Sequence, residues 1–210
     1  MLKLLFSFDN RQSWVPRFIA SSSLQLAILV GQGRFGEVYR GGYYGDVAVK
    51  HLEWDYVAED FPQIVEASIA YLETVNHDNI VLFRGYSFTT TKKISIVTNW
   101  CDGPTLFDSI HTLNSFDVLQ AIPFALQICN AVAFLHNKNI VHRNLCSKNI
   151  FVENSDKVIL TDFGIFSMTH EKVRASTHWA CYAAPELSTA VTLHQTDLPF
   201  SCQSDVFAFG

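Results

Sequence analysis

The sequence carries little charge, and its charged residues form no basic run. Charged residues make up 17% of the 210 residues, and the formal net charge is −5. Domains that bind nucleic acid typically gather lysine and arginine into a patch or stripe that contacts phosphates. The composition therefore argues against a nucleic-acid-binding domain, and we expect no nucleic-acid partner.

Long apolar runs and paired cysteines are also missing. No stretch approaches the roughly 18 consecutive apolar residues of a membrane span. The apolar start "MLKLLFSF" is cut short by Asp9 and no cleavage site follows, which favours an irregular N-terminus over a secretory signal. The five cysteines are widely spaced and contain no C-x-x-C pair, which excludes a disulfide framework or a zinc pattern. We therefore expect a cytoplasmic protein.

The chain has enough hydrophobic residues to form a core, since they make up 49% of it. Short alternating runs separated by glycines predict three antiparallel strands between residues 24 and 50. Apolar residues at steps of three and four predict a helix over 61–75, and helical spacing dominates again after about residue 117. The expected α+β division is an irregular extension at 1–23, a strand-rich lobe at 24–100, a hinge at 100–103 and a helical lobe at 104–210.

A glycine-rich turn between two predicted strands is the first candidate site. Its pattern is Gly31-x-Gly33-x-x-Gly36-x-Val38. Glycines let the backbone approach a polyphosphate and turn N–H groups toward it. A dinucleotide site would place the glycines between a strand and a helix. Because "VAVK" with Lys50 follows, the pattern predicts a nucleotide lid with a phosphate-pairing cation.

Three further motifs follow in a fixed order in the second half of the chain. They are "HRNLCSKN" at 142–149, "DFG" at 162–164 and "APE" at 184–186. With the glycine-rich turn, they resemble the protein kinase superfamily across residues 24–210. The resemblance implies a bilobal fold, with an antiparallel β-lobe that carries one helix, a mainly helical second lobe, and ATP with Mg²⁺ in the cleft.

The resemblance also implies a role for each position of the nucleotide site. Lys50 would hold the α- and β-phosphates, while Asn149 and Asp162 would ligate Mg²⁺. The expected adenine contacts are Thr98 as gatekeeper, Asn99 and Cys101 in the hinge, and Val38, Ala48 and Phe151 around the ring. The expected regulatory spine is Leu72, Phe83, His142 and Phe163, and Asp205 would brace the catalytic loop from below.

Two positions of the catalytic loop depart from the kinase pattern. Asn144 stands where an aspartate accepts the substrate's hydroxyl proton, and an amide cannot take that proton. Losing a positioned base costs roughly 10²–10⁴-fold in rate, although a loose phosphoryl transition state leaves the base little to do early on. Cys146 replaces a lysine that meets the γ-phosphate, and a thiol brings no positive charge there. Tyrosine kinases lack this lysine and remain active, so Cys146 alone does not decide whether the chain is an enzyme.

A third departure concerns the helix that should support Lys50. Ser68 stands where a glutamate pairs with that lysine in kinases, and Glu66 points to another side of the helix. Without a partner, Lys50 would still attract phosphate but would be held less firmly. The alternatives are a displaced alignment and a lysine held by Asp162.

Several segments point to one branch of the superfamily. "IVTNWCDG" resembles the hinge of Raf-type kinases, while "SKNIF", "VILTDFGIF", "STHWACYAAPE" and "LPFSCQSDVFAFG" resemble the kinase suppressor of Ras family. That family consists of Raf-related scaffolds that bind Raf and MEK kinases and have little or no phosphotransfer activity. The resemblance implies an ATP-binding pseudokinase scaffold in Ras–MAP kinase signalling. The alternative is a weakly active serine/threonine kinase.

The same resemblance bears on assembly. Asn76 replaces an arginine that supports side-to-side dimers in Raf relatives, and a neutral amide cannot form the same charge-assisted bonds, which puts such a dimer in doubt. Recruitment to a membrane would need regions outside this sequence. Because the chain stops at Gly210, inside a segment that begins a long helix in kinases, we expect the helical lobe to be incomplete.

Overall fold

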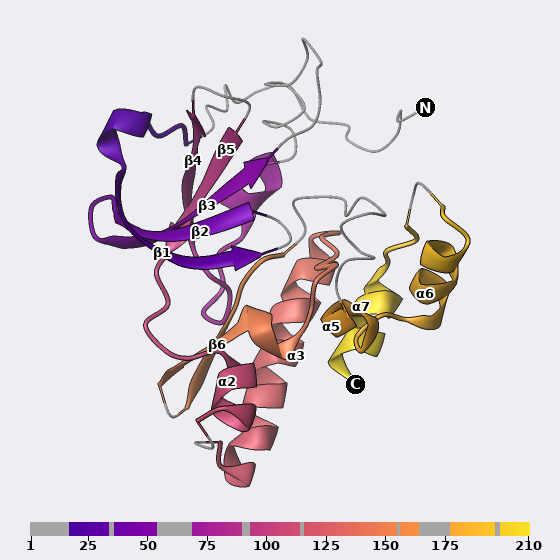
Figure 1. Ribbon diagram of the computed structural model, residues 1–210. Coiled ribbons are helices and arrows are strands. Elements are labelled where there is room, and N and C mark those ends of the chain that lie inside the picture. Colours follow the sequence, from indigo (N-terminus) through magenta and orange to yellow (C-terminus); the bar gives the residue numbers. More distant parts are fainter. Residues whose placement is uncertain are drawn as a thin grey trace.

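Five antiparallel strands form one sheet in the first half of the chain (Figure 1). The computed structural model describes residues 17–33, 36–53, 69–89, 93–113, 116–154, 156–163, 177–195 and 198–210. The strands are β1 (Gln25–Gly33), β2 (Gly36–Gly42), β3 (Asp46–Glu53), β4 (Phe83–Thr89) and β5 (Lys93–Asn99). Their order in the sheet is β1-β2-β3-β5-β4. The three strands predicted between residues 24 and 50 are therefore confirmed.

Helices and a strand pair follow, which gives the expected α+β composition. The helices are α2 (Leu106–His111), α3 (Ala121–Asn137), α5 (Thr177–Ala180), α6 (Pro185–Thr192) and α7 (Cys202–Phe209). The 3₁₀ turns are η1 (Ser21–Ser23), η2 (Tyr71–Thr74), η3 (Val118–Gln120) and η4 (Ser147–Asn149), and the pair is β6 (Ile150–Asn154) with β7 (Lys157–Leu160). Most of the helix predicted at 61–75 lies outside the described residues; helical residues 69–70 and η2 form its described end.

The alternating sequence of strand β3 determines which of its side chains face the core and which face the cleft. Val47 and Val49 are fully buried and pack in one cluster with Ile19 and Val97. Successive side chains of a strand point to opposite faces of the sheet. Ala48 and Lys50 therefore face the other way, where both line the cleft described below.

The segment just before β1 completes the free edge of the sheet. Phe18 forms a parallel bridge with Tyr86 of β4, and the N–H of Ile19 donates to the Tyr86 carbonyl over 2.7 Å. Gly85 makes room for this segment, because a Cβ there would come within 2.4 Å of the Arg17 carbonyl oxygen. Its φ of +155° also favours glycine. Part of the extension expected at 1–23 thus packs on the sheet, while residues 1–16 lie outside the described part of the chain.

Helix α3 is the longest described helix, and it packs one face against β7. Its buried residues fall at helical spacing and are Phe124, Ile128, Ala131, Val132 and Leu135. By length and composition alone, Val118–Asn137 could also cross a membrane, which the sequence analysis did not anticipate. One face of this segment is buried, but only 28% of its apolar window is buried inside the structure, and length and composition alone are weak evidence for a membrane span.

Candidate functional site: the cleft between the sheet and the catalytic loop

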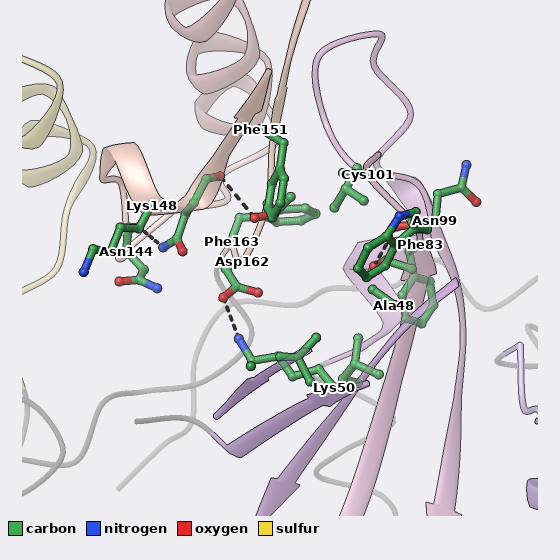
Figure 2. Close-up of a pocket in the computed structure, with 18 of the residues that line it drawn as sticks. Ala48, Lys50, Phe83, Asn99, Cys101, Asn144, Lys148, Phe151, Asp162 and Phe163 are labelled. Atoms are coloured by element: carbon green, nitrogen blue, oxygen red, sulfur yellow. Dashed lines mark hydrogen bonds and ion pairs between the residues drawn. The ribbon is translucent and has the colours of Figure 1, made fainter. Parts of the chain in front are cut away.

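A cavity of about 410 Å³ lies between the five-stranded sheet and the loop at 142–149. Pockets of this size are typical of small-molecule and cofactor sites. The sequence-predicted residues that line the cavity are Gly31, Val38, Ala48, Lys50, Thr98, Asn99, Cys101, Asn144, Asn149, Phe151 and Asp162. Figure 2 shows the hinge residues at one end of this cavity and Asn144 at the other. Residues far apart in the sequence therefore meet in one cleft.

Gly33 and Gly36, two further predicted site residues, pair with each other where β1 meets β2. Gly36 has a φ of +123°, and a Cβ at this position would come within 1.8 Å of the His51 carbonyl oxygen. A side chain at position 36 would therefore push β2 away from β3. The structure gives this glycine a role in closing the turn onto the sheet; its role toward phosphate stays a prediction.

Two backbone N–H groups at the hinge are already engaged within the protein. The N–H of Asn99 donates to the Leu82 carbonyl over 2.9 Å, and that of Trp100 donates to the Asp46 carbonyl over 3.3 Å. Of the described hinge residues that line the cavity, Cys101 is the one whose N–H is left for a ligand. The Cys101 side chain is buried, and burial raises the pKa of its thiol to about 12. This thiol acts as an apolar part of the wall and not as a nucleophile.

Lys50 and Asp162 form an ion pair at the other end of the cavity. The Lys50 Nζ lies 2.6 Å from Oδ2 of Asp162, and both side chains are partly exposed (Figure 2). Ser68, which stands at the position expected to support this lysine, lies outside the described residues. The structure shows the pair with Asp162, while the question of which residue occupies the glutamate position of the helix stays a prediction.

Asn149 is oriented by the loop it belongs to. Its side-chain Nδ2 donates to the Asn144 carbonyl over 2.7 Å, and the hydroxyl of Thr161 donates to the Asn149 carbonyl over 3.1 Å. The amide oxygen of Asn149 is thus left as an acceptor beside the carboxylate of Asp162 in the cavity lining. Two oxygen ligands fit Mg²⁺, which is usually held by one or two carboxylates together with substrate phosphates.

The described residues contain no group of three histidine, cysteine, aspartate or glutamate side chains able to hold a metal ion. Mg²⁺ usually completes its shell with water and with substrate phosphates. The donor set fits a nucleotide–metal complex better than a free metal ion.

The two altered positions of the catalytic loop occupy different places. Asn144 lines the main cleft, and its backbone N–H donates to Nδ1 of His142 over 3.2 Å. Cys146 lines a second cavity of about 40 Å³, together with Trp179 and Tyr182. The sequence treated both as parts of one centre; in the structure Asn144 lines both cavities, whereas Cys146 lines the second cavity and not the main cleft.

Asp205 braces the catalytic loop, as the sequence predicted. Its Oδ2 accepts the backbone N–H of His142 over 2.6 Å, and its Oδ1 accepts that of Arg143 over 2.9 Å. Nε2 of His136 lies 2.8 Å from the same carboxylate. Asp205 belongs to the first turn of α7, which Ser201 caps, and a negative charge is favoured at that end of a helix.

The four residues expected to form a spine are all buried and all line the cleft: Leu72, Phe83, His142 and Phe163. The rings of His142 and Phe163 have centroids 6.4 Å apart and are tilted by 59°. Further lining residues that the sequence analysis did not name include Thr105, Arg143 and Lys148. The sequence could have pointed to Lys148, because this lysine follows Cys146 by two positions in the same loop.

Burial of His142 predicts a loss of stability in mild acid. Burial lowers the pKa of this imidazole below its ordinary value of 6.5, against the opposing effect of Asp205 and Asp162. Below pH 6.5 the unfolded chain takes up a proton that the folded chain does not, so the free energy of unfolding falls as the pH falls. The slope from this one group reaches about 1.4 kcal/mol per pH unit at most. Urea unfolding at several pH values between 7.5 and 5.5 measures how the free energy of unfolding depends on pH.

The matched comparison for this prediction is His142→Phe, which keeps an aromatic ring and removes the titration. Because other groups titrate equally in both proteins, their contributions cancel in the difference. The variant should lose less stability on acidification than the unaltered chain. Equal pH slopes for the two proteins would show that the His142 titration does not contribute.

The fold, the glycine-rich turn and the motif order define a protein kinase domain. The chain belongs to this family, since residues 24–210 match the family "Protein tyrosine and serine/threonine kinase". Over 94% of its length it is 36% identical to "Kinase suppressor of Ras B" of Caenorhabditis elegans, of which it covers 40%. It is 34% identical over 97% of its length to "Kinase suppressor of Ras 2" of Homo sapiens, of which it covers 23%.

A second group of relatives is similar to a comparable degree. Over 91% of its length the chain is 37% identical to "RAF proto-oncogene serine/threonine-protein kinase" of Xenopus laevis, of which it covers 30%. The chain therefore spans well under half the length of these relatives. The resemblance to the kinase suppressor of Ras and Raf group, expected from the sequence motifs, is confirmed for the kinase domain.

Proposed function

We propose that this protein is a nucleotide-binding pseudokinase scaffold that organises Raf-like and MEK-like kinases in Ras signalling. The observation that carries the proposal is the cleft itself. Lys50, Asn149 and Asp162 all line a nucleotide-sized cavity, and the same cavity is lined by Asn144, an amide at the position of the kinase base. The similarity to proteins named kinase suppressors of Ras supports the scaffold role and its partners.

In this proposal each end of the cavity has a distinct task. Val38, Ala48 and Phe151 contact the adenine ring, and the N–H of Cys101 donates to it. Lys50 binds the phosphates, and Asn149 and Asp162 hold Mg²⁺, which neutralises phosphate charge. A ligand that bridges the sheet and the catalytic loop favours the arrangement of the two lobes in which it fits, and a protein partner that recognises this arrangement binds more tightly.

Replacing Lys50 by alanine is expected to weaken Mg–ATP binding by about tenfold to 100-fold. The reason is the loss of a charge-assisted hydrogen bond worth about 1.5–3 kcal/mol. Isothermal titration of the purified protein with Mg–ATP measures this change. Lys157→Ala is the matched control, because Lys157 pairs with Glu153 on the β6–β7 hairpin and is not among the described residues that line the cavity. Mg–ATP affinity that is equal in all three proteins would contradict the assigned role of Lys50.

The second candidate function is that of a weakly active serine/threonine kinase. It is favoured by the retained set of Lys50, Asn149 and Asp162, because phosphoryl transfer depends mainly on positioning and electrostatics. Phosphotransfer to a MEK-like kinase separates the two candidates. Nucleotide binding without turnover supports the scaffold, whereas robust turnover that is lost in the Lys50→Ala variant supports the enzyme.

A further inference from the structure

We propose that Lys148 binds the terminal phosphate of the nucleotide and so supplies the positive charge that Cys146 does not bring. This inference rests on the proposed nucleotide function and goes one step further, to the discrimination between tri- and diphosphate. Lys148 lines the main cleft, whereas Cys146 lines the smaller second cavity. The cation and the thiol therefore occupy different places, although they are two residues apart in the same loop.

Local structure holds Lys148 at this place. It is the central residue of η4 (Ser147–Asn149), which packs against α2. Helix α2 begins after Thr105, whose hydroxyl oxygen accepts the N–H of Asp108 over 3.0 Å. The first turn of α2 carries Phe107, and Nζ of Lys148 lies 4.6 Å from the centre of its ring. This contact with the aromatic face orients the ammonium group and leaves its charge intact.

Lys148 is better placed to meet a further anion than the other cations of the lining. Lys50 already pairs with Asp162, and the guanidinium of Arg143 lies 5.8 Å from the ring centre of Phe200, beside the second cavity. Within the described ranges, Lys148 forms no ion pair, and its side chain is exposed to solvent. Its charge can therefore meet a ligand without breaking an existing pair.

The position along the cavity identifies which phosphate Lys148 would meet. Figure 2 shows Lys148 and Asn144 at the same end of the cavity, opposite the hinge residues Asn99 and Cys101. A nucleotide whose base lies at the hinge extends its phosphates toward this end. The outermost phosphate carries the highest charge, and it lies farthest from the base. In this placement Lys148 would meet the third phosphate of a triphosphate, which a diphosphate lacks.

The experiment compares the binding of Mg–ATP, Mg–ADP and adenosine to the unaltered protein and to Lys148→Gln. We expect Mg–ATP affinity to fall by about tenfold, since one charge-assisted contact is lost at a partly exposed site. Mg–ADP affinity should change by less than about twofold and adenosine affinity not at all, because neither ligand presents the terminal phosphate. Higher ionic strength should shrink the difference for Mg–ATP.

Two further variants complete the design. Lys148→Arg keeps the charge and should retain most of the preference for triphosphate. Lys157→Gln removes a partly exposed lysine of strand β7 that is not among the described lining residues, and it should leave all three affinities unchanged. An equal loss for Mg–ATP and Mg–ADP, or no loss for either, would overturn the inference about Lys148 while leaving nucleotide binding intact. Failure of the unaltered protein to bind any nucleotide would overturn the proposed function and this inference with it.

Discussion

Replacing Asn144 by aspartate is expected to raise the rate of phosphotransfer by about 10²–10⁴-fold, the usual contribution of a positioned general base. The side chain at position 144 already lies in the cleft, and the hydrogen bond from its backbone N–H to Nδ1 of His142 fixes the loop there. The substitution therefore changes the chemistry of the group and not its place. The measurement is transfer of labelled phosphate from ATP to a MEK-like kinase by the purified protein.

Adding Cys146→Lys to this variant should contribute much less. Cys146 lines the second cavity, while Lys148 already brings a cation to the main cleft. Lys50→Ala in the same background is the control, since it should abolish the gained activity and so exclude a contaminating kinase. If Asn144→Asp binds Mg–ATP normally and still transfers no phosphate, the absence of a base is not what blocks the reaction.

Replacing Asp205 by alanine is expected to lower the free energy of unfolding by about 3–5 kcal/mol. The carboxylate is 2% exposed and accepts two backbone N–H groups of the catalytic loop, and it also contacts His136. Truncation leaves these buried groups without their partner, which costs far more than the net value of the hydrogen bonds. Urea unfolding followed by far-ultraviolet circular dichroism measures the change.

Asp205→Asn tests the reason for this loss. An asparagine keeps one acceptor oxygen and loses the charge, so a smaller loss of about 1–3 kcal/mol is expected. Asp156→Ala is the control, because Asp156 is exposed and lies in the turn between β6 and β7. Equal stability of Asp205→Ala and the unaltered chain would show that the catalytic loop holds its shape without this carboxylate.

Strand positions were predictable because the signals that determine them are local. The alternation of Val47, Ala48, Val49 and Lys50 follows from the two-residue repeat of a strand, and β3 has that alternation in the structure. Gly36 likewise indicates a backbone conformation with positive φ, which other residues adopt only at an energetic cost. These features depend on neighbours within a few residues, so they can be read from the chain itself.

The partners of the site residues were only partly predictable, because they come from distant parts of the chain. The pairing of Lys50 with Asp162 was one of several alternatives in the sequence, and it joins residues 112 positions apart. The contact of Ile19 with β4 was not foreseen, since no local pattern marks a segment that docks on a sheet edge. The different surroundings of Cys146 and Lys148 could not be predicted from the sequence either. They depend on contacts with residues outside the loop.

The sequence by itself determined the kinase family, the strands around the glycine-rich turn and the absence of a proton-accepting side chain at position 144. These follow from residue identity and from short-range periodicity, which do not change when the chain folds. Only the tertiary structure showed that Asp162 pairs with Lys50 and that Lys148, and not Cys146, is among the residues lining the main cleft. The physical reason is that electrostatic contacts depend on distances through space, which the packing of the lobes sets.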